Sequence, residues 1–139
     1  MSIIKISEIS IAVKDLEQAV TDYGKMGFEV TQIEEDTTPP IQARWVVASQ
    51  GQGDVALSLM ESTEAGSPID KFIQRRGEGI FSISLRVTDL DGEIEKLKAK
   101  GAEFVLDKPQ KSEYLAGRLN FTKPSALTHG VVFELQEIT

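Results

Sequence analysis

Histidine and cysteine, which often act in catalysis and bind transition metals, are nearly absent from this sequence. There is a single histidine, His129, and there is no cysteine. The absence of cysteine excludes disulfides, thiolate metal sites and thiol nucleophiles. Histidine titrates near neutral pH, so His129 is a candidate ligand, acid or base, although a lone histidine is more often structural. Both interpretations of His129 stay open from the sequence.

Arg44 and Trp45 are neighbours in a predicted strand over residues 43–49. Side chains alternate between the two faces of a strand, so one of these residues points inward and the other outward. Trp45 is predicted to lie either in the core or in the wall of a ligand cavity. An arginine can bind a carboxylate even in an acidic protein, which makes Arg44 a candidate contact to an anionic group.

The charge balance excludes two classes of partner. Lys and Arg number 15 against 22 for Asp and Glu among 139 residues, which gives a formal charge of −7. Such a chain repels phosphate backbones and anionic membrane surfaces, so we expect no nucleic-acid or membrane partner. No run approaches the roughly 20 apolar residues that span a bilayer. The first residues also lack the features of a secretory signal, so we expect a cytoplasmic location.

An internal repeat organises the chain. Residues 9–16 match residues 83–90 at one constant offset, and Gly27 pairs with Gly101 at the same offset. A third match, of residues 55–61 with residues 131–137, has a slightly larger offset. Three matches in one order indicate that the chain contains two copies of one unit.

Each copy has the same predicted order of elements. Period-two alternation predicts opening strands over 8–13 and 82–87, and helical apolar spacing follows each of them. Asp15 and Asp89 are predicted helix N-caps, and Gly27 and Gly101 are predicted to end these helices. The remaining predicted strands cover 28–35, 43–49 and 54–61 in the first copy and 103–106, 114–122 and 130–137 in the second. Each copy is therefore predicted to be a βαβββ unit.

These elements predict an α+β protein with one domain over residues 1–139. The first unit covers about 1–62 and the second about 79–139. A linker helix over about 67–75 lies between them, with Ser67 as its cap and Pro68 at its first position. A single unit would expose one face of its sheet. We therefore expect two curved mixed sheets that enclose one cavity for a small molecule.

A tandem βαβββ unit with these strand openings resembles the vicinal oxygen chelate superfamily, which includes glyoxalase I, extradiol dioxygenases and bleomycin-resistance proteins. Within it, the chain is similar to the methylmalonyl-CoA epimerases. The residues that carry this similarity are 11–16, 67–73, 76–80 and 130–135. The resemblance implies an α-carbonyl or acyl-CoA type substrate, and relatives of this kind commonly form homodimers, so we expect a homodimer here.

The resemblance also implies one divalent metal at the cavity floor, held by four side chains. The corresponding positions here are Glu8, Ser58, Ser82 and Glu134. Serine is a poor ligand for a transition metal, so we expect a degenerate site and no cofactor, although two carboxylates could still hold Mg²⁺ weakly. The alternative is that Glu8 and Glu134 are cavity-facing carboxylates that hydrogen-bond to Ser58, Ser82 or water.

Two functions follow as hypotheses. The epimerase resemblance implies a glutamate base ahead of the third strand, but Pro40 or Ile41 stands there, with Glu35 and Asp36 upstream. An enzyme of this kind would use Glu134 or Glu8 as acid and base. Its oxyanion donors would be Arg44 or the hydroxyls of Ser58 and Ser82. The alternative is a metal-free binding protein that sequesters a small molecule, as bleomycin-resistance relatives do.

Overall fold

The computed structural model describes residues 3–49, 55–112 and 116–138. The chain forms two compact units. The first unit is Glu8–Phe81, and the second is Ser82–Thr139 together with Met1–Ser7. No helix in the described ranges is long and apolar enough to cross a membrane.

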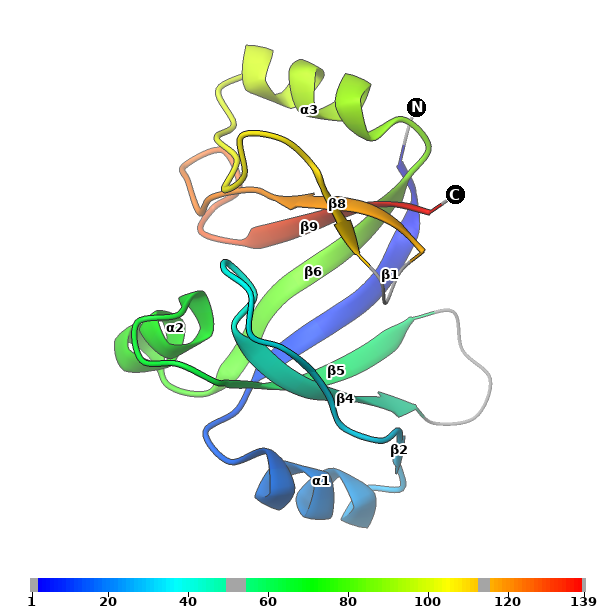
Figure 1. The fold of residues 1–139 in the computed structure, drawn as a ribbon, viewed down its shortest axis with the longest axis vertical. Helices are drawn as coiled ribbons and strands as arrows, with labels where there is room; N and C mark the ends of the chain where they lie inside the picture. Colours follow the sequence, from blue (N-terminus) through cyan, green and yellow to red (C-terminus); the bar gives the residue numbers. More distant parts are fainter. Residues whose placement is uncertain (1–2, 50–54, 113–115, 139) are drawn as a thin grey trace. The chain divides into compact units, whose positions relative to one another are not determined.

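The first unit is a mixed sheet with two helices (Figure 1). Its strands run in the order β2-β4-β5-β1, with β3 also paired to β4, and β1 and β5 are parallel. Helix α1 packs on this sheet through Leu16 and Ala19, which contact Val13, Val46 and Leu59. The elements are β1 (Ile3–Ala12), α1 (Leu16–Lys25), β2 (Glu29–Val30), β3 (Glu34–Asp36), β4 (Ala43–Ser49), β5 (Ala56–Ser62) and α2 (Pro68–Arg76).

The second unit repeats this plan. Its strands run in the order β6-β9-β8-β7, and β6 and β9 are parallel. Helix α3 packs through Leu90 and Ile94 against Val87, Phe104 and Leu135. The elements are β6 (Gly79–Val87), α3 (Leu90–Ala99), β7 (Gln110–Ser112), β8 (Gly117–Phe121) and β9 (Val132–Ile138). The prediction of an α+β fold with a mixed sheet and βαβββ-like units is confirmed.

The predicted ends of the helices are confirmed. The side chain of Asp15 accepts a hydrogen bond from the backbone N–H of Gln18, and that of Asp89 accepts one from Gly92, each at 3.1 Å. Just after the helices, Gly27 and Gly101 have φ angles of 97° and 101°. Side chains with a Cβ rarely adopt this left-handed conformation, so glycine is favoured at both positions.

The linker helix is also present, as α2. Ser67 caps it by accepting a hydrogen bond from the backbone N–H of Asp70 at 3.0 Å, and Pro68 is its first residue. Ile69 and Phe72 bury the apolar face of α2 against Ala12 and Ala43. Phe72 also meets the ring of Phe81 edge to face, with centroids 5.4 Å apart.

The prediction of one continuous strand over 28–35 is wrong, because the structure has two short strands there. Residues 31–33, between β2 and β3, are exposed and outside any strand. The hydroxyl of Thr31 accepts a hydrogen bond from the backbone N–H of Val47 at 2.9 Å, where a regular strand would use a backbone carbonyl as the acceptor. A side chain that competes in this way interrupts the regular ladder of backbone hydrogen bonds.

The predicted strand over 103–106 is also wrong, since only Phe104 forms an isolated bridge, to Thr122. Backbone hydrogen bonds still join Val105 to Phe121 and Lys123 to Glu103, but at Leu106 the side chain of Asn120 replaces the backbone partner. It accepts from the N–H of Leu106 at 3.1 Å and donates to the carbonyl of Leu106 at 3.0 Å. Strand β7 was not predicted. Residues 54, 114 and 115, which begin two other predicted strands, lie outside the described residues.

Candidate functional site

A buried carboxyl group lies in the first unit, on β1. The parallel pairing of β1 with β5 sets Ser10 opposite Ser58, and both serines are almost fully buried. The hydroxyl of Ser10 lies 3.3 Å from Oε1 of Glu8, and Ser58 also hydrogen-bonds this carboxyl group. Burial raises the pKa of Glu8 above its ordinary value, while the bonds from Ser58 and Ser10 lower the pKa in part. Glu8 is therefore easier to protonate than an exposed glutamate.

A second carboxyl group lies in the second unit, on β9. Glu134 is paired with Ser84 across the parallel strands, and the Ser84 hydroxyl donates to Oε1 of Glu134 at 3.1 Å. The side-chain amide of Gln136 donates to the same oxygen. Ser7 in turn donates to Oε1 of Gln136 at 2.9 Å. Ser82 is buried on β6, where its register partner is Val132 rather than Glu134.

Arg44 lies among acidic side chains of the first unit. Oxygens of Asp15, Glu17 and Glu61 lie within 4.8 Å of one another. The guanidinium of Arg44 donates to Glu17 and, at 2.6 Å, to Glu61. These two carboxylates raise the pKa of Arg44, and the hydrogen bond from Arg44 lowers the pKa of Glu17. Because Arg44 compensates two of the three charges, this cluster is a weak candidate for a cation site.

Trp45 and His129 occupy different surroundings. Trp45, on β4, is half-buried opposite Met60 and packs against the core of Ala12, Ala43, Ile69 and Phe72. His129 is exposed in the turn that precedes β9, with a φ angle of 53°. Its backbone N–H donates to the carbonyl of Ala126 at 3.4 Å. Contacts of Arg44, Trp45 and His129 to a ligand stay predictions.

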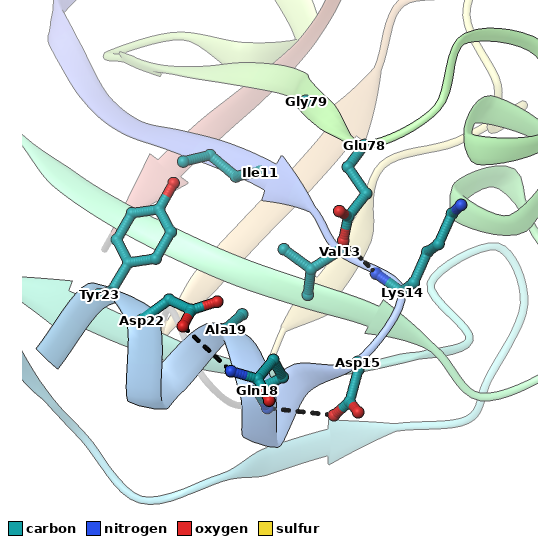
Figure 2. Close-up of a pocket in the computed structure, with 10 residues that line it drawn as sticks. All are labelled: Ile11, Val13, Lys14, Asp15, Gln18, Ala19, Asp22, Tyr23, Glu78 and Gly79. Atoms are coloured by element: carbon teal, nitrogen blue, oxygen red, sulfur yellow. Dashed lines mark hydrogen bonds between the residues drawn. The ribbon is translucent and has the colours of Figure 1, made fainter. Parts of the chain in front are cut away.

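A pocket of about 400 Å³ lies in the first unit between α1, the end of β1 and the start of β6 (Figure 2). Its lining includes apolar groups of Ile11, Val13, Ala19 and Tyr23. Residues 11 and 13 of the chain point to the opposite face of the sheet from residues 8 and 10, because side chains alternate. None of the predicted site residues lines this pocket, so it is separate from the carboxyl group of Glu8.

Comparison with known proteins identifies the family. Residues 8–119 match the model of the Glyoxalase/Bleomycin resistance protein/Dioxygenase superfamily. The chain belongs to this superfamily. The resemblance inferred from the repeat and its motifs is therefore confirmed. A comparison with curated protein sequences gives no significant match.

Solved structures of methylmalonyl-CoA epimerases, which share this fold, are similar to the chain over nearly its whole length. The enzyme from Mycobacterium tuberculosis has 27% identity and a TM-score of 0.83, and the match covers 96% of this chain and 87% of that one. A methylmalonyl-CoA epimerase in complex with methylmalonyl-CoA and NH4+ has 28% identity and a TM-score of 0.83, with 99% and 96% covered. A variant of the Streptomyces coelicolor enzyme, in complex with 2-nitronate-propionyl-CoA, has 28% identity, a TM-score of 0.83 and 99% of both chains covered.

The metal that the superfamily resemblance implies does not fit the residues present. Ser58 already serves as a hydrogen-bond partner of Glu8, and Oε1 of Glu134 already accepts two hydrogen bonds. The other implied position holds the neutral hydroxyl of Ser82. Zinc and similar ions require imidazole, thiolate or carboxylate ligands. The residues at these four positions are therefore not suited to hold such an ion tightly.

The sequence did not single out three residues that hold the two carboxyl groups. Ser10 contacts Glu8, and Ser84 and Gln136 contact Glu134. A signal for the two serines was present, because Ser10 and Ser84 occupy the same position in the repeated strand openings. No comparable signal marked Gln136, since the first copy has Met60 at the corresponding position.

Proposed function

We propose that this protein binds an acyl-CoA, or a similar α-carbonyl compound, and acts on it as an epimerase or isomerase without a tightly held metal. One observation carries the proposal. The chain matches methylmalonyl-CoA epimerases over 96–99% of its length at 27–28% identity, and two of those structures are complexes with an acyl-CoA compound.

Glu8 and Glu134 are the proposed proton-transfer groups. In such a reaction one carboxylate removes the proton from the carbon next to the thioester carbonyl, and a carboxylic acid returns a proton to the opposite face. The environment of Glu8, whose burial raises its pKa, supports the role of acid. The hydrogen bonds from Ser84 and Gln136 hold Oε1 of Glu134 and orient its carboxyl group, which supports the role of base.

The negative charge that develops on the thioester oxygen needs hydrogen-bond donors if no metal is present. Ser82 and Ser58 are the proposed donors, and their burial supports this role because hydrogen bonds are stronger where water is excluded. Ser82 is the stronger of the two, since the hydroxyl of Ser58 already hydrogen-bonds Glu8. Arg44 is a weaker candidate, since its guanidinium already pairs with Glu17 and Glu61. Trp45 and His129 are proposed as contacts to the body of the substrate.

Proton exchange tests the proposal directly. Purified protein is incubated with 2R- or 2S-methylmalonyl-CoA in deuterated water, with and without added Co²⁺, and deuterium at the α-carbon is followed by mass spectrometry. We expect incorporation without added metal and little change on its addition. The absence of exchange under both conditions would exclude the epimerase proposal for this substrate.

The alternative proposal is a metal-free binding protein that sequesters a small molecule. Serine at two of the four positions implied for metal ligands favours it, because this removes the electrophile that the epimerase resemblance implies. Calorimetry with acyl-CoA compounds and hydrophobic metabolites separates the two. Saturable binding of a compound that is recovered unchanged supports sequestration, and turnover of every compound that binds contradicts it.

We also propose that the protein is a homodimer. Two-fold dimers are the commonest assembly of soluble proteins, and the superfamily resemblance favours the same state. The chain has a mass of 15.3 kDa. Sedimentation equilibrium is expected to give twice this mass, and a single species at the mass of one chain would contradict the proposal.

A further inference from the structure

The side chain of Gln136 is a buried link in the second unit. Only 3% of this residue is exposed. Its Oε1 accepts a hydrogen bond from the hydroxyl of Ser7 at 2.9 Å, and its Nε2 donates to Oε1 of Glu134. The opposite orientation of the amide would place two acceptor oxygens against each other. The carboxylate therefore fixes which end of the amide faces Glu134.

Oε1 of Glu134 receives a second donor, the hydroxyl of Ser84 at 3.1 Å. Ser84 is 1% exposed and is the register partner of Glu134 across β6 and β9. Two donors from different strand positions converge on one carboxylate oxygen. Such an arrangement restricts the rotation of the carboxyl group, because turning it would break both bonds.

The fold itself does not require an amide at this position. In the first unit the residue that corresponds to Gln136 in the repeat is Met60, and the same parallel pair of strands forms there. A thioether donates no hydrogen bond. Burying an amide costs free energy unless its polar atoms form hydrogen bonds. Gln136 forms such bonds with Ser7 and Glu134, whereas Met60 at the equivalent position of the first unit needs none.

We infer that Gln136 is a positioning residue for Glu134. Together with Ser84 it holds Oε1, so that the carboxylate keeps one orientation toward the α-carbon of a bound acyl compound. Ser7 holds the far end of the amide and thereby aligns it. This inference rests on the proposed function, in which Glu134 removes the proton.

The kinetic test replaces the amide by the side chain that the other unit uses. Gln136→Met keeps a similar volume and is expected to lower kcat for α-proton exchange about tenfold, while KM changes little, because a hydrogen bond to a charged group is lost. Gln18→Met is the matched control. It removes a similar amide-to-carboxylate bond, of 3.0 Å to Asp22, on the exposed surface of α1, and kcat is expected to stay unchanged. Unchanged kcat in Gln136→Met, with intact folding by circular dichroism, would overturn the inference.

A spectroscopic test does not depend on activity. The side-chain NH₂ signals of Gln136 in a ¹⁵N–¹H spectrum of the wild type are expected to be well separated, with one proton shifted by the carboxylate. In Glu134→Ala that proton should move toward the position of an exposed glutamine, and in Ser7→Ala the shift should be smaller. If the wild type exchanges no substrate proton, the proposed function fails, whereas an unmoved amide signal in Glu134→Ala overturns the positioning role.

Discussion

The first turns of α1 and α3 are held by equivalent side chains in the two units. In the first unit Arg44 bridges Glu17 and Glu61, and the second oxygen of Glu61 accepts the backbone N–H of Leu16 at 2.9 Å. In the second unit Arg118 bridges Asp91 and Glu137, and Glu137 accepts the backbone N–H of Leu90 at 2.8 Å. The last strand of each unit is thus tied to the start of its helix in the same way.

The carboxyl groups proposed for chemistry do not repeat in this way. At one pair of equivalent positions the first unit has Glu8 where the second has Ser82, and at the other pair Ser58 corresponds to Glu134. Each unit therefore keeps one glutamate but places it on a different strand. The ion pairs that tie the last strand of a unit to the start of its helix are therefore the same in both copies. The glutamate proposed for chemistry, in contrast, lies on the opening strand of one copy and on the closing strand of the other.

Removing the proposed base is expected to have the largest effect. Glu134→Gln keeps the shape of the side chain but cannot accept the proton, so kcat for α-proton exchange should fall by about 10²–10⁴-fold. Glu93→Gln is the matched comparison, because it replaces a buried carboxyl group of the same unit that has no part in the proposed reaction. A Glu134→Gln protein that exchanges the proton at the wild-type rate would assign the chemistry to another residue.

Equivalent core positions allow the two units to be compared for stability. Leu59 and Leu135 occupy the same place in the repeat and are 0% and 1% exposed. Replacing either by alanine removes buried methyl groups and leaves a cavity, so each variant should lose about 2–5 kcal/mol of unfolding free energy in urea titrations. A loss confined to one of the two variants would show that the cores of the units differ in packing, in spite of their repeated sequence.

Glu8 is expected to make stability depend on pH. Its pKa is raised above 4.5 in the folded protein, so the folded state binds the proton more tightly than the unfolded chain does. Its contribution to stability is therefore full below that ordinary pKa and is lost as the pH rises through the folded-state pKa. Glu8→Gln should therefore gain stability relative to the wild type as the pH rises toward neutrality, with a smaller difference in acid. Urea titrations that show the same difference at every pH would contradict this.

The smallest effect is expected from the repeated arginines. The side chains of Arg44 and Arg118 are 25% and 31% exposed, so solvent weakens their ion pairs. Arg44→Met and Arg118→Met should each lower the melting temperature slightly, and added salt should reduce the effect. Arg44 lowers the pKa of Glu17, and the backbone N–H of Leu90, followed by Arg118, lowers the pKa of Glu137. The stabilisation from these contacts is therefore present above pH 4.5 and is lost on acidification. A decrease that salt leaves untouched would indicate lost packing instead.

Much of the fold followed from local sequence pattern. The caps at Asp15 and Asp89 and the glycines after both helices depend on interactions within a few residues, which a sequence shows directly. The breaks near Thr31 and Asn120 did not follow. At both places a side-chain oxygen accepts the hydrogen bond that a backbone carbonyl would otherwise accept, and local sequence pattern does not predict this exchange.

The sequence indicated candidate site positions but not the contacts that these residues make. The resemblance indicated Glu8, Ser58, Ser82 and Glu134, and in the first unit Ser58 does contact Glu8. The contact of Gln136 with Ser7 joins residues 129 positions apart in the chain. Its formation depends on the register of the strands, which hydrophobic periodicity alone does not determine.

The offset between the copies grows along the chain. It is larger between Glu61 and Glu137 than between Arg44 and Arg118, so the second copy has a longer connection between its arginine and its glutamate. The bridging arginine and glutamate nevertheless meet in both copies. The additional residues of the second copy therefore lie outside the sheet, in the connection that contains the turn at His129. Changes of length in that connection are accordingly expected to leave the pairing of β8 with β9 intact.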